Sequence, residues 1–434
     1  MMATPSTGLL GVGILLLLLL TGLPVGIALG LVGLVGMTLT LGFEPSLIKA
    51  GVVVIESLTR YELGTLPLFL LMAHLCFSSN ASRDLFDAAA KWIGHRPGGL
   101  AQAAVAGCAG FGAINGSSLA TAATIGLVAV PQMRRHGYDD SLATGVVAAG
   151  GTLGQMIPPS GTLIVFGIIA EQSIGTLFSA AIIPGLTQML LYFLVISILV
   201  RWRPHLAPRT SPAGKAEKIA ALLKVIDILV LILVVTGGIV VGWFTPSEAA
   251  SMGAVGALLI CIWRQRFSWK MLSQALEETL RTSGLIYTVI IGTLIFSVFI
   301  SITGLAEAAG TLISSAGGGQ ITTVLLMALF LLLLGSVLDG LALMLLATPI
   351  LLPVITSLGL SPIWFGIFLV RATEIGFIHP PMGMNLYVIQ GVAGDVTIGQ
   401  VFRGVIPFLA ADFLHLLLLV LFPALALALP EWLS

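Results

Sequence analysis

Charged residues are scarce in this sequence. Only 9% of its 434 residues are charged, whereas 57% are hydrophobic, and the mean hydropathy is +1.10. A soluble domain cannot cover such a composition with a polar surface. The 19 basic residues are balanced by 19 acidic residues, so the chain also lacks the excess positive charge that is typical of a nucleic-acid-binding protein.

Cysteine is scarce, and the motifs of common enzymes are missing. The three cysteines, Cys76, Cys108 and Cys261, lie in apolar surroundings without CxxC or Cys/His spacing, which argues against a disulfide framework or a zinc site. The chain has no GxxxxGK[ST], HExxH or GxSxG motif. We therefore expect no enzymatic activity and no organic cofactor, and we expect any energy source to be an ion gradient.

Apolar sequence is abundant instead. Long apolar runs recur along the chain, for example at 9–20, 226–241 and 324–334. Each run approaches the roughly 20 residues that a helix needs to span a bilayer, or reaches that length together with its apolar neighbours. The first run lacks a positive n-region and a small-residue cleavage site, so we expect a retained span rather than a signal peptide. The sequence therefore predicts an all-α polytopic membrane protein.

Glycine and proline recur at a fixed offset. Pro24 and Pro246 are 222 residues apart (246 − 24 = 222), and the same offset joins Pro131 to Pro353, Gly154 to Gly376, Pro158 to Pro380, Pro159 to Pro381 and Gly161 to Gly383. We interpret this as an internal repeat, with 1–202 as the first half and 219–434 as the second. The segment between them, 203–218, is polar and rich in proline, so it is predicted to be a linker. Its basic residues place it in the cytoplasm by the positive-inside rule.

Each half is predicted to contain five spans, a re-entrant hairpin and a span broken by proline. The hairpins are expected at 99–133 and 320–356, and the broken spans at 140–170 and 361–392. An odd number of spans inverts the second half relative to the first, and inverted repeats with interrupted helices are a recurring plan of secondary transporters.

The linker and the Arg134–Arg135 loop carry cationic residues, whereas the loop 356–362 has none. The positive-inside rule therefore places that last loop, and both chain ends, outside.

Both broken spans carry a Pro-Pro pair, in GQMIPPSG at 154–161 and in EIGFIHPPMG at 374–383. Proline removes a helical hydrogen bond, and inside a membrane the freed carbonyls are tolerated only where they face protein, water or a ligand. A hairpin tip precedes each break, GAINGSSLATAATIG at 112–126 and GSVLDGLALMLLATPILLP at 335–353. The oxygens of tips and breaks suit Na⁺, whereas the N-termini of half-helices suit anionic substrate groups.

Three groups of candidate residues follow from this pattern. The first sodium site is predicted to comprise Asn115, Gly116, Ser117, Gly154, Ile157 and Pro158, and the second Leu338, Asp339, Gly376, His379 and Pro380. The residues expected to face the substrate are Ser118, Ser160, Gly340 and Asn385. The alternative interpretations are plain helix kinks at the prolines, an ordinary turn with an N-cap at the first tip, and a helix cap at Asp339.

Two charged residues interrupt the apolar sequence of the second broken span. Arg371 and Glu374 are three residues apart on one helical face, and charges inside a membrane usually pair. We expect a structural ion pair, with a substrate contact as the alternative. His379 can satisfy a backbone carbonyl, and a role in proton coupling is the alternative.

Taken together, INGSSLATAATIG, GGTLGQMIPPSG, the Asp-Gly tip with its TPILLP arm, and EIGFIHPPMGMNLYVI resemble the large membrane (permease) subunit of tripartite ATP-independent periplasmic (TRAP) transporters. The resemblance covers nearly the whole chain. It implies Na⁺-coupled uptake of a small organic acid delivered by a periplasmic binding protein, an elevator-like movement of the hairpin-bearing core, and a location in the bacterial inner membrane. It also implies a small membrane subunit of about four spans as a partner. Asn115 and His379 depart from the family's more frequent Ser-Gly-Ser-Ser tip and Thr-Pro-Pro break.

Other interpretations stay open at this point. A self-sufficient Na⁺/anion symporter would need no binding protein, and a channel would need a continuous polar pore. A non-transporting scaffold would leave the matched polar breaks without a ligand. The substrate is also open, with sialic acid, C4-dicarboxylates and other organic acids as candidates. The amphipathic stretches 82–95 and 267–279 are predicted to be helices that lie in the membrane interface and brace a scaffold.

Overall fold

The computed structural model describes residues 4–305, 307–308, 319–335, 338, 340–380 and 382–433, and the regular structure within these ranges is entirely helical. The helices up to the linker are α1 (Pro5–Leu20), α2 (Val25–Leu41), α3 (Phe43–Thr59), η1 (Tyr61–Gly64), α4 (Thr65–Ser78), α5 (Ala81–Ile93), α6 (Gly99–Asn115), α7 (Ser118–Arg135), α8 (Asp140–Met156), α9 (Gly161–Ile169), α10 (Ile174–Trp202) and η2 (Pro204–Leu206). The helices after it are α11 (Lys215–Ile232), η3 (Leu233–Gly237), α12 (Gly238–Val240), α13 (Pro246–Trp263), α14 (Trp269–Thr303), α16 (Gly319–Gly335), α17 (Gly340–Ser357), α18 (Pro362–Ile378), α19 (Met384–Ala393), α20 (Ile398–Leu421) and α21 (Ala424–Leu433).

Many of these helices can cross a membrane. Among the described residues, seven helical segments are long and apolar enough to do so: η1 with α4, α10, α11 to α12, α13, α14, α17 and α20. The pair α8 and α9, bent by 41° at its break, raises the number to eight. The shorter apolar helices are α1, α2, α16 and α21. The protein is therefore a multi-pass membrane protein.

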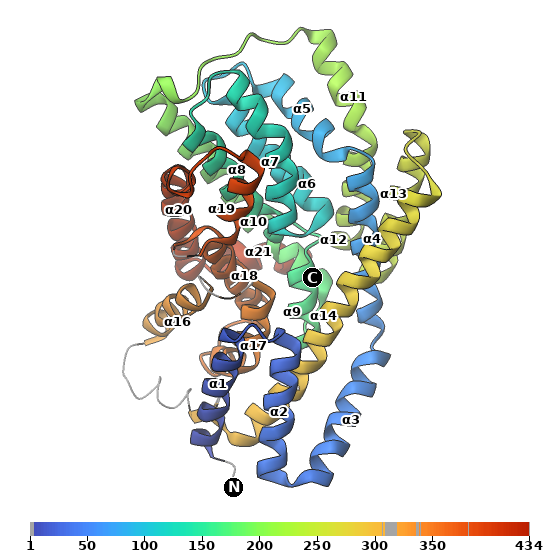
Figure 1. The fold of residues 1–434 in the computed structure, drawn as a ribbon, viewed down its shortest axis with the longest axis vertical. Helices are drawn as coiled ribbons and strands as arrows, with labels where there is room; N and C mark the ends of the chain where they lie inside the picture. The colour runs from blue at the N-terminus through green and yellow to red at the C-terminus, as the bar shows by residue number, and fades with distance from the viewer. Residues whose placement is uncertain are drawn as a thin grey trace.

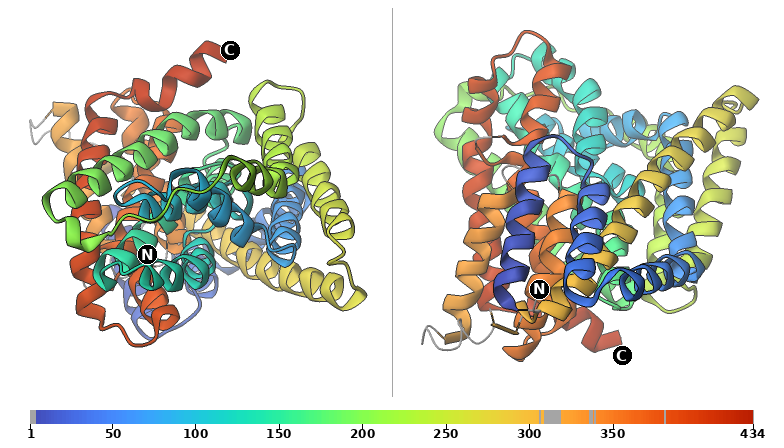
Figure 2. Two further views of the ribbon diagram at one scale, coloured as in Figure 1. Left: turned by 90° about the horizontal axis from the view of Figure 1, so that it is seen from above. Right: turned by 60° about the horizontal axis from the view of Figure 1, so that its bottom comes forward.

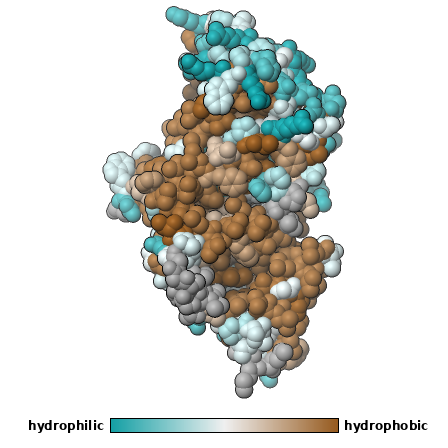
Figure 3. Space-filling model, turned by 90° about the vertical axis from the view of Figure 1, so that its left-hand side faces the viewer, coloured by the Kyte–Doolittle hydropathy of each residue, from teal (hydrophilic) through white to brown (hydrophobic). Residues whose placement is uncertain are grey.

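The molecular surface agrees with this assignment. Figure 3 shows hydrophobic side chains over most of one face, with hydrophilic side chains gathered at its upper end. Large apolar side chains such as Leu17, Leu190 and Leu280 are exposed. An apolar exterior of this extent is stable against lipid rather than against water.

The helix pairs α6–α7 and α16–α17 lie at different levels of the molecule. Figure 1 shows the first pair in the upper part and the second in the lower part. α8 packs against α6 and α7, α18 packs against α16 and α17, and α8 also contacts α18. The two helices that precede the proline pairs therefore meet between the two hairpins.

Both proline pairs interrupt helices, as their chemistry predicts. α8 ends at Met156 and α9 begins at Gly161, while α18 ends at Ile378 and α19 begins at Met384. The residues after α8 and α18 are both extended, Ile157 with φ −76° and ψ 122° and His379 with φ −89° and ψ 136°. This is the conformation that a following proline favours.

A second set of helices lies beside this core. α2 packs along α14, and α13 packs along α4, so each contact joins the N-terminal half of the chain to the C-terminal half. A separate apolar cluster holds α1, α2 and α14 together through Leu15, Leu29 and Phe296. In the right-hand view of Figure 2, both labelled chain ends lie on the lower side.

The two amphipathic stretches differ in structure. The stretch 82–95 forms the separate helix α5 (Ala81–Ile93), as expected. The stretch 267–279 does not form a helix of its own, because α14 continues for 35 residues from Trp269 to Thr303. Its first fifteen or so residues contain neither proline nor glycine, so nothing in the backbone chemistry ends the helix there.

Candidate functional site

The first hairpin tip is a two-residue connection between α6 and α7. Asn115 ends α6, and Gly116 follows in the left-handed region with φ +64°. Ser117 caps α7, because its hydroxyl accepts a hydrogen bond from the backbone N–H of Ala120 at 3.4 Å. Asn-Gly supplies the tight turn and serine the N-cap, so this local geometry follows directly from the sequence.

The first tip touches the first break through glycine. A Cβ added at Gly116 would lie 2.7 Å from the carbonyl oxygen of Pro159, and one added at Gly112 would lie 2.5 Å from Gly154 Cα. A Cβ added at Gly154 would lie 2.9 Å from the carbonyl oxygen of Ser117. Only glycine permits these backbone approaches. The structure thus brings the tip residues Gly116 and Ser117 against the break.

The other residues of the first predicted site lie around this contact. Asn115 is half-buried at the end of α6. The carbonyl oxygen of Pro158 accepts a hydrogen bond from the Thr236 hydroxyl of η3 at 3.3 Å, so one of its two lone pairs is already used. Ile157 faces Gly185 of α10, where an added Cβ would lie 2.9 Å from Ile157 Cγ1. Its side chain therefore packs, and only its backbone is available to a ligand.

The second tip meets the second break in a similar way. A Cβ added at Gly376 would lie 2.6 Å from the carbonyl oxygen of Gly335, the last residue of α16. Leu338 is half-buried, and its N–H donates to the Leu334 carbonyl at 2.8 Å. Asp339, the predicted carboxylate of this site, and Pro381 lie outside the described residues.

His379 and Pro380 complete the described part of the second break. The His379 ring packs edge-on against Phe413, with 6.0 Å between the ring centroids. Its Nδ1 is buried and has no hydrogen-bond partner among the described residues. Pro380 is exposed. The imidazole therefore presents an unpaired nitrogen next to an apolar ring.

Two of the predicted substrate-facing residues bond to each other. The Asn385 side-chain amide donates to the Ser118 hydroxyl at 2.9 Å and to the carbonyl oxygen of Ala148 at 2.9 Å. Both side chains are buried, and the Asn385 Oδ1 atom has no partner within the described structure. This bond joins the first tip to the start of α19, at the second break. It thus connects the two predicted sites.

The remaining two residues that were predicted to face the substrate, Ser160 and Gly340, lie at the starts of α9 and α17. Ser160 is fully buried, and its hydroxyl caps α9 by accepting from the Leu163 N–H at 3.3 Å. Gly340 begins α17, and a Cβ added there would lie 3.4 Å from the Gln155 amide nitrogen. The start of the second hairpin arm therefore reaches the first break.

Polar side chains that the sequence patterns did not single out also lie here. Gln155 donates to the Thr162 hydroxyl at 2.7 Å, and its Oε1 is buried without a partner in the described part of the chain. The Thr121 hydroxyl is likewise buried and unpartnered there, and it would lie 2.4 Å from a Cβ added at Gly154. Thr121 follows Ser118 by three residues and Gln155 lies inside the proline-break motif, so helical spacing and motif position would have identified both.

The arrangement suits a hard monovalent cation better than a transition metal. The described atoms around the first break are hydroxyl, amide and carbonyl oxygens, which are hard and neutral ligands. No group of three or more His, Cys, Asp or Glu side chains that could share a metal occurs in the described ranges. The unpartnered, buried Thr121 oxygen is an atom that such a cation would satisfy.

Arg371 and Glu374 form the ion pair that their spacing predicted. Arg371 Nη1 lies 2.6 Å from Glu374 Oε2, and both side chains are fully buried. Arg371 also pairs with Asp412 of α20, which accepts a further hydrogen bond from the Tyr192 hydroxyl of α10 at 2.7 Å. Asp412 is a lone acidic residue in an apolar helix, and this isolation was the available signal for it.

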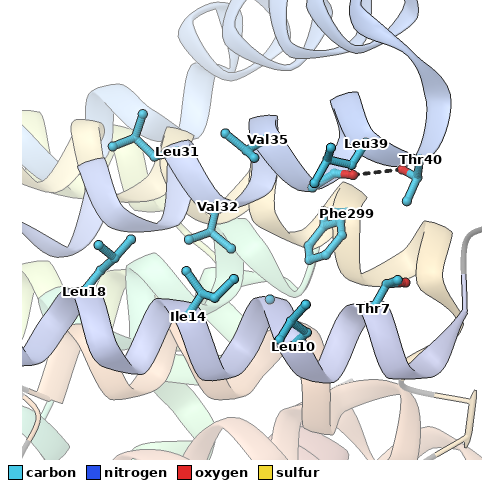
Figure 4. Close-up of a pocket in the computed structure, with 12 residues that line it drawn as sticks. Thr7, Leu10, Ile14, Leu18, Leu31, Val32, Val35, Leu39, Thr40 and Phe299 are labelled. Carbon is cyan, nitrogen blue, oxygen red and sulfur yellow. Dashed lines mark hydrogen bonds between the residues drawn. The ribbon is translucent and has the colours of Figure 1, made fainter. Parts of the chain in front are cut away.

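An apolar groove lies between α1 and α2 (Figure 4). The side chains of Leu10, Ile14 and Val35 face it, and Phe299 of α14 forms its floor. The hydroxyl of Thr40 donates to carbonyls of its own helix at 3.0 Å, and that of Thr7 donates to the Thr4 carbonyl at 2.6 Å. The groove therefore offers no free polar group to an ionic substrate.

An all-helical membrane protein in which two interrupted helices meet two hairpin tips has the form of a secondary transporter. The structure is similar to the crystal structure of the YdaH transporter of Alcanivorax borkumensis, with a TM-score of 0.62, 15% identity, and 98% of each chain covered. This likeness concerns the fold alone.

Sequence comparison identifies the family. Residues 12–425 match the family model described as "Tripartite ATP-independent periplasmic transporter, DctM component". The C4-dicarboxylate TRAP transporter large permease protein DctM of Pseudomonas aeruginosa is 33% identical over 404 residues, covering 93% of this chain and 94% of that protein. The sialic acid TRAP transporter large permease protein SiaM of Vibrio cholerae is 31% identical over 420 residues, covering 95% and 96%. The isethionate TRAP transporter permease protein DctMQ of Oleidesulfovibrio alaskensis is 31% identical over 416 residues, covering 95% of this chain and 64% of that protein.

The chain therefore belongs to the DctM family of TRAP transporter large permease subunits. It is one component of a transport system and belongs to a family of transporters, not of enzymes.

Proposed function

We propose that this protein carries out Na⁺-coupled uptake of a small organic acid by an elevator mechanism, as the large permease subunit of a TRAP system in the bacterial inner membrane. The observation that carries the proposal is that each hairpin tip packs against a proline break so closely that only glycine fits between the two backbones. These contacts lie at Gly116 and Gly154 and again at Gly335 and Gly376. Such contacts place backbone oxygens of two elements around one point. Unwound backbone near a membrane midplane is the usual form of ion and substrate sites in secondary transporters.

An inverted repeat, with halves 1–202 and 219–434, is part of the proposal. The bounds of the helices support it, because α7 and α17 begin 222 residues apart (340 − 118), as do α8 and α18 (362 − 140). Counting the shorter α1 and α2 and each broken helix as one span, and assigning α17 to the second hairpin, gives five spans in each half. The hairpins at opposite levels in Figure 1 fit a second half that is inverted.

The two sodium sites are proposed at the two contacts. The first uses the carbonyl oxygens of the tip and break together with the Ser117 and Thr121 hydroxyls. The second uses the carbonyls near Gly335 and Gly376 together with the carboxylate of Asp339. Neutral oxygens suffice for a weakly bound monovalent ion, and a single carboxylate strengthens the second site.

The anionic substrate is proposed to lie between the sites. The N-termini of α9 and α19 carry partial positive charge, and Ser160 and Asn385 stand at these two termini. The three relatives are named for C4-dicarboxylates, sialic acid and isethionate, which are all organic anions. We therefore assign the substrate to the organic acids and propose a periplasmic binding protein as its donor.

A small membrane subunit is the second proposed partner. The DctMQ relative is named as a permease protein, and this chain covers 64% of its length. The remaining length of that protein is available for a further membrane component. This chain would obtain the same component as a separate subunit of about four spans.

Uptake in proteoliposomes tests the proposal. The chain is reconstituted with its small subunit, and accumulation of a labelled organic acid is measured with an inward Na⁺ gradient and the binding protein present. Replacing Na⁺ by K⁺, or omitting the binding protein, should each abolish accumulation. Equal uptake with K⁺ contradicts sodium coupling, while Na⁺-dependent uptake without the binding protein identifies a self-sufficient symporter.

A further inference from the structure

A buried polar cluster lies beside the proposed transport site and is not used by it. We call it the Arg371 cluster; its members are Arg371, Glu374, Asp412, Tyr192, Gln188 and Thr152, and each is fully buried. They come from α8, α10, α18 and α20. Arg371 donates to both carboxylates, Tyr192 donates to Asp412, and the Gln188 amide donates to the Thr152 hydroxyl at 3.0 Å and to the Tyr192 oxygen at 3.2 Å.

The formal charges in this cluster do not balance. One guanidinium faces two carboxylates, which gives +1 − 2 = −1 if both acids are ionised. A net charge buried away from water is so costly that such a group binds a proton or a counter-ion instead. The cluster therefore needs one more positive charge than its described side chains supply.

The neighbouring titratable groups do not supply it. His415 of α20 lies with Nε2 2.8 Å from the Thr187 hydroxyl, and its buried Nδ1 has no acceptor in the described structure. A charged imidazole would need an acceptor at both nitrogens, and it would stand near the Arg371 charge. The packed helices α9, α16 and α17 carry no titratable side chain in their described residues, and Tyr387 of α19 is exposed.

We propose that the Arg371 cluster holds one bound proton, which resides on the Glu374 carboxyl group while Asp412 stays ionised. Asp412 Oδ1 accepts from both Arg371 and Tyr192, whereas Glu374 accepts only from Arg371. More donors stabilise the ionised form, so Asp412 keeps its charge.

Unpartnered atoms support the same assignment. Glu374 Oε1, Asp412 Oδ2 and Gln188 Oε1 are all buried without a hydrogen-bond partner in the described residues. Of the two carboxyl groups, it is that of Glu374 with which the Gln188 side chain interacts. A proton on Glu374 Oε1 makes it a donor, and Gln188 Oε1 is an acceptor in need of one. One proton thus neutralises the cluster and supplies a donor for the amide oxygen.

Infrared difference spectroscopy of the full-length protein in lipid nanodiscs tests the proposal. At neutral pH the wild type should show the carbonyl stretch of a protonated carboxylic acid, shifted in D₂O. Glu374→Gln and Asp412→Asn should each lose this band, because one carboxylate is enough for one guanidinium. Glu44→Gln, which removes an exposed carboxylate, and His415→Gln should keep it.

The pH dependence of unfolding gives a second readout that a merely structural ion pair would not change. Above the titration range of an unfolded glutamate, the folded wild type holds one proton more than the unfolded chain, so its stability falls as pH rises. Relative to Glu374→Gln, its unfolding equilibrium constant should increase about tenfold per pH unit. The double variant Glu374→Gln/Asp412→Asn leaves the guanidinium unpaired and should melt lower than either single variant, and adding Arg371→Met should restore the melting temperature.

The outcomes separate this proposal from sodium coupling. A wild type without the carbonyl band, and with the same pH dependence as Glu374→Gln, overturns the bound proton. If in addition Na⁺ raises the melting temperature of the wild type more than that of the two single variants, the missing charge is a sodium ion. Na⁺ bound at the proposed hairpin-tip sites would raise the melting temperature of all three proteins alike, so only the difference between them reports on the cluster.

Discussion

Replacing Gly154 by alanine tests the contact between the first tip and the first break. Away from tertiary contacts, Gly→Ala within a helix stabilises it by about 0.5–1 kcal/mol. At Gly154 the added methyl carbon would lie 2.9 Å from the Ser117 carbonyl oxygen and 3.0 Å from Thr121 Cβ, and closer still to the Thr121 hydroxyl. An ordinary contact begins near 3.4 Å, so the tip and α8 must separate by about half an ångström or more. Overpacking of this kind costs about 1–3 kcal/mol.

The displaced atoms are those proposed to bind the first sodium ion. If the strain is released by moving the tip off the break, the ion site opens, and 1–3 kcal/mol corresponds to a roughly five- to 150-fold higher Na⁺ concentration for half-maximal uptake. We expect Gly154→Ala to fold, to melt at a lower temperature than the wild type, and to require more Na⁺. Uptake against Na⁺ concentration is measured at matched protein abundance.

Gly161→Ala is the matched control at the same break. Its added methyl carbon would lie 4.0 Å from the nearest contact, the carbonyl oxygen of Gly116, and Gly161 does not have a positive φ. This variant should match the wild type in Na⁺ dependence and should melt no lower than the wild type. If the two alanine variants behave alike, or if Gly154→Ala is the more stable one, the glycine contact is not what holds the tip.

Three further predictions concern the rest of the fold. Single cysteines at Arg135 and Ser361, in a cysteine-free background, should be labelled from opposite sides of the membrane, and labelling from one side would remove the inverted repeat. Arg264 binds Asp227 and Asp84 at 2.7 Å and connects the end of α13 to α11 and α5, and the hydrogen bonds that Arg264 donates to Asp227 raise the pKa of Arg264. Arg264→Gln should destabilise the protein by about 2–3 kcal/mol in chemical unfolding, and no change would show that solvent already screens these pairs. The hydrogen bond from Arg134 lowers the pKa of Asp395 below its usual value, so this contact stabilises the protein at neutral pH, and the stabilisation is lost as the pH falls. Asp395→Asn should remove this part of the fall in melting temperature at acidic pH. A melting temperature with an unchanged pH dependence contradicts the contact.

Local chemistry explains the features that the sequence predicted well. Pro158 and Pro380 end helices because proline removes a donor and restricts the residue before it, and these rules need no knowledge of the partners. The Asn115-Gly116 turn and the Ser117 cap follow equally from short-range preferences. The interrupted helices and the first tip were therefore accessible from the sequence.

Long-range contacts were not accessible in this way. Asp412 and Tyr192 are 220 residues apart, and the bond from Asn385 to Ser118 spans 267 residues. Neither pairing has a periodicity or a motif that reveals it in one sequence. The same limit applies to α14, where amphipathicity predicted a separate helix but no residue ends it before the apolar part begins.

The pairing of α2 with α14 and of α4 with α13 has a consequence for assembly. Each half of the chain supplies one member of both pairs, so neither half expressed alone can cover its own helix faces. The connection between α10 and α11 is exposed over most of its length, and it contributes little to that packing. Two co-expressed fragments divided there should consequently associate into one complex, and a fluorescent domain inserted at the same point should be tolerated. In this respect we expect the two halves to depend on each other for folding as the two subunits of an obligate heterodimer do.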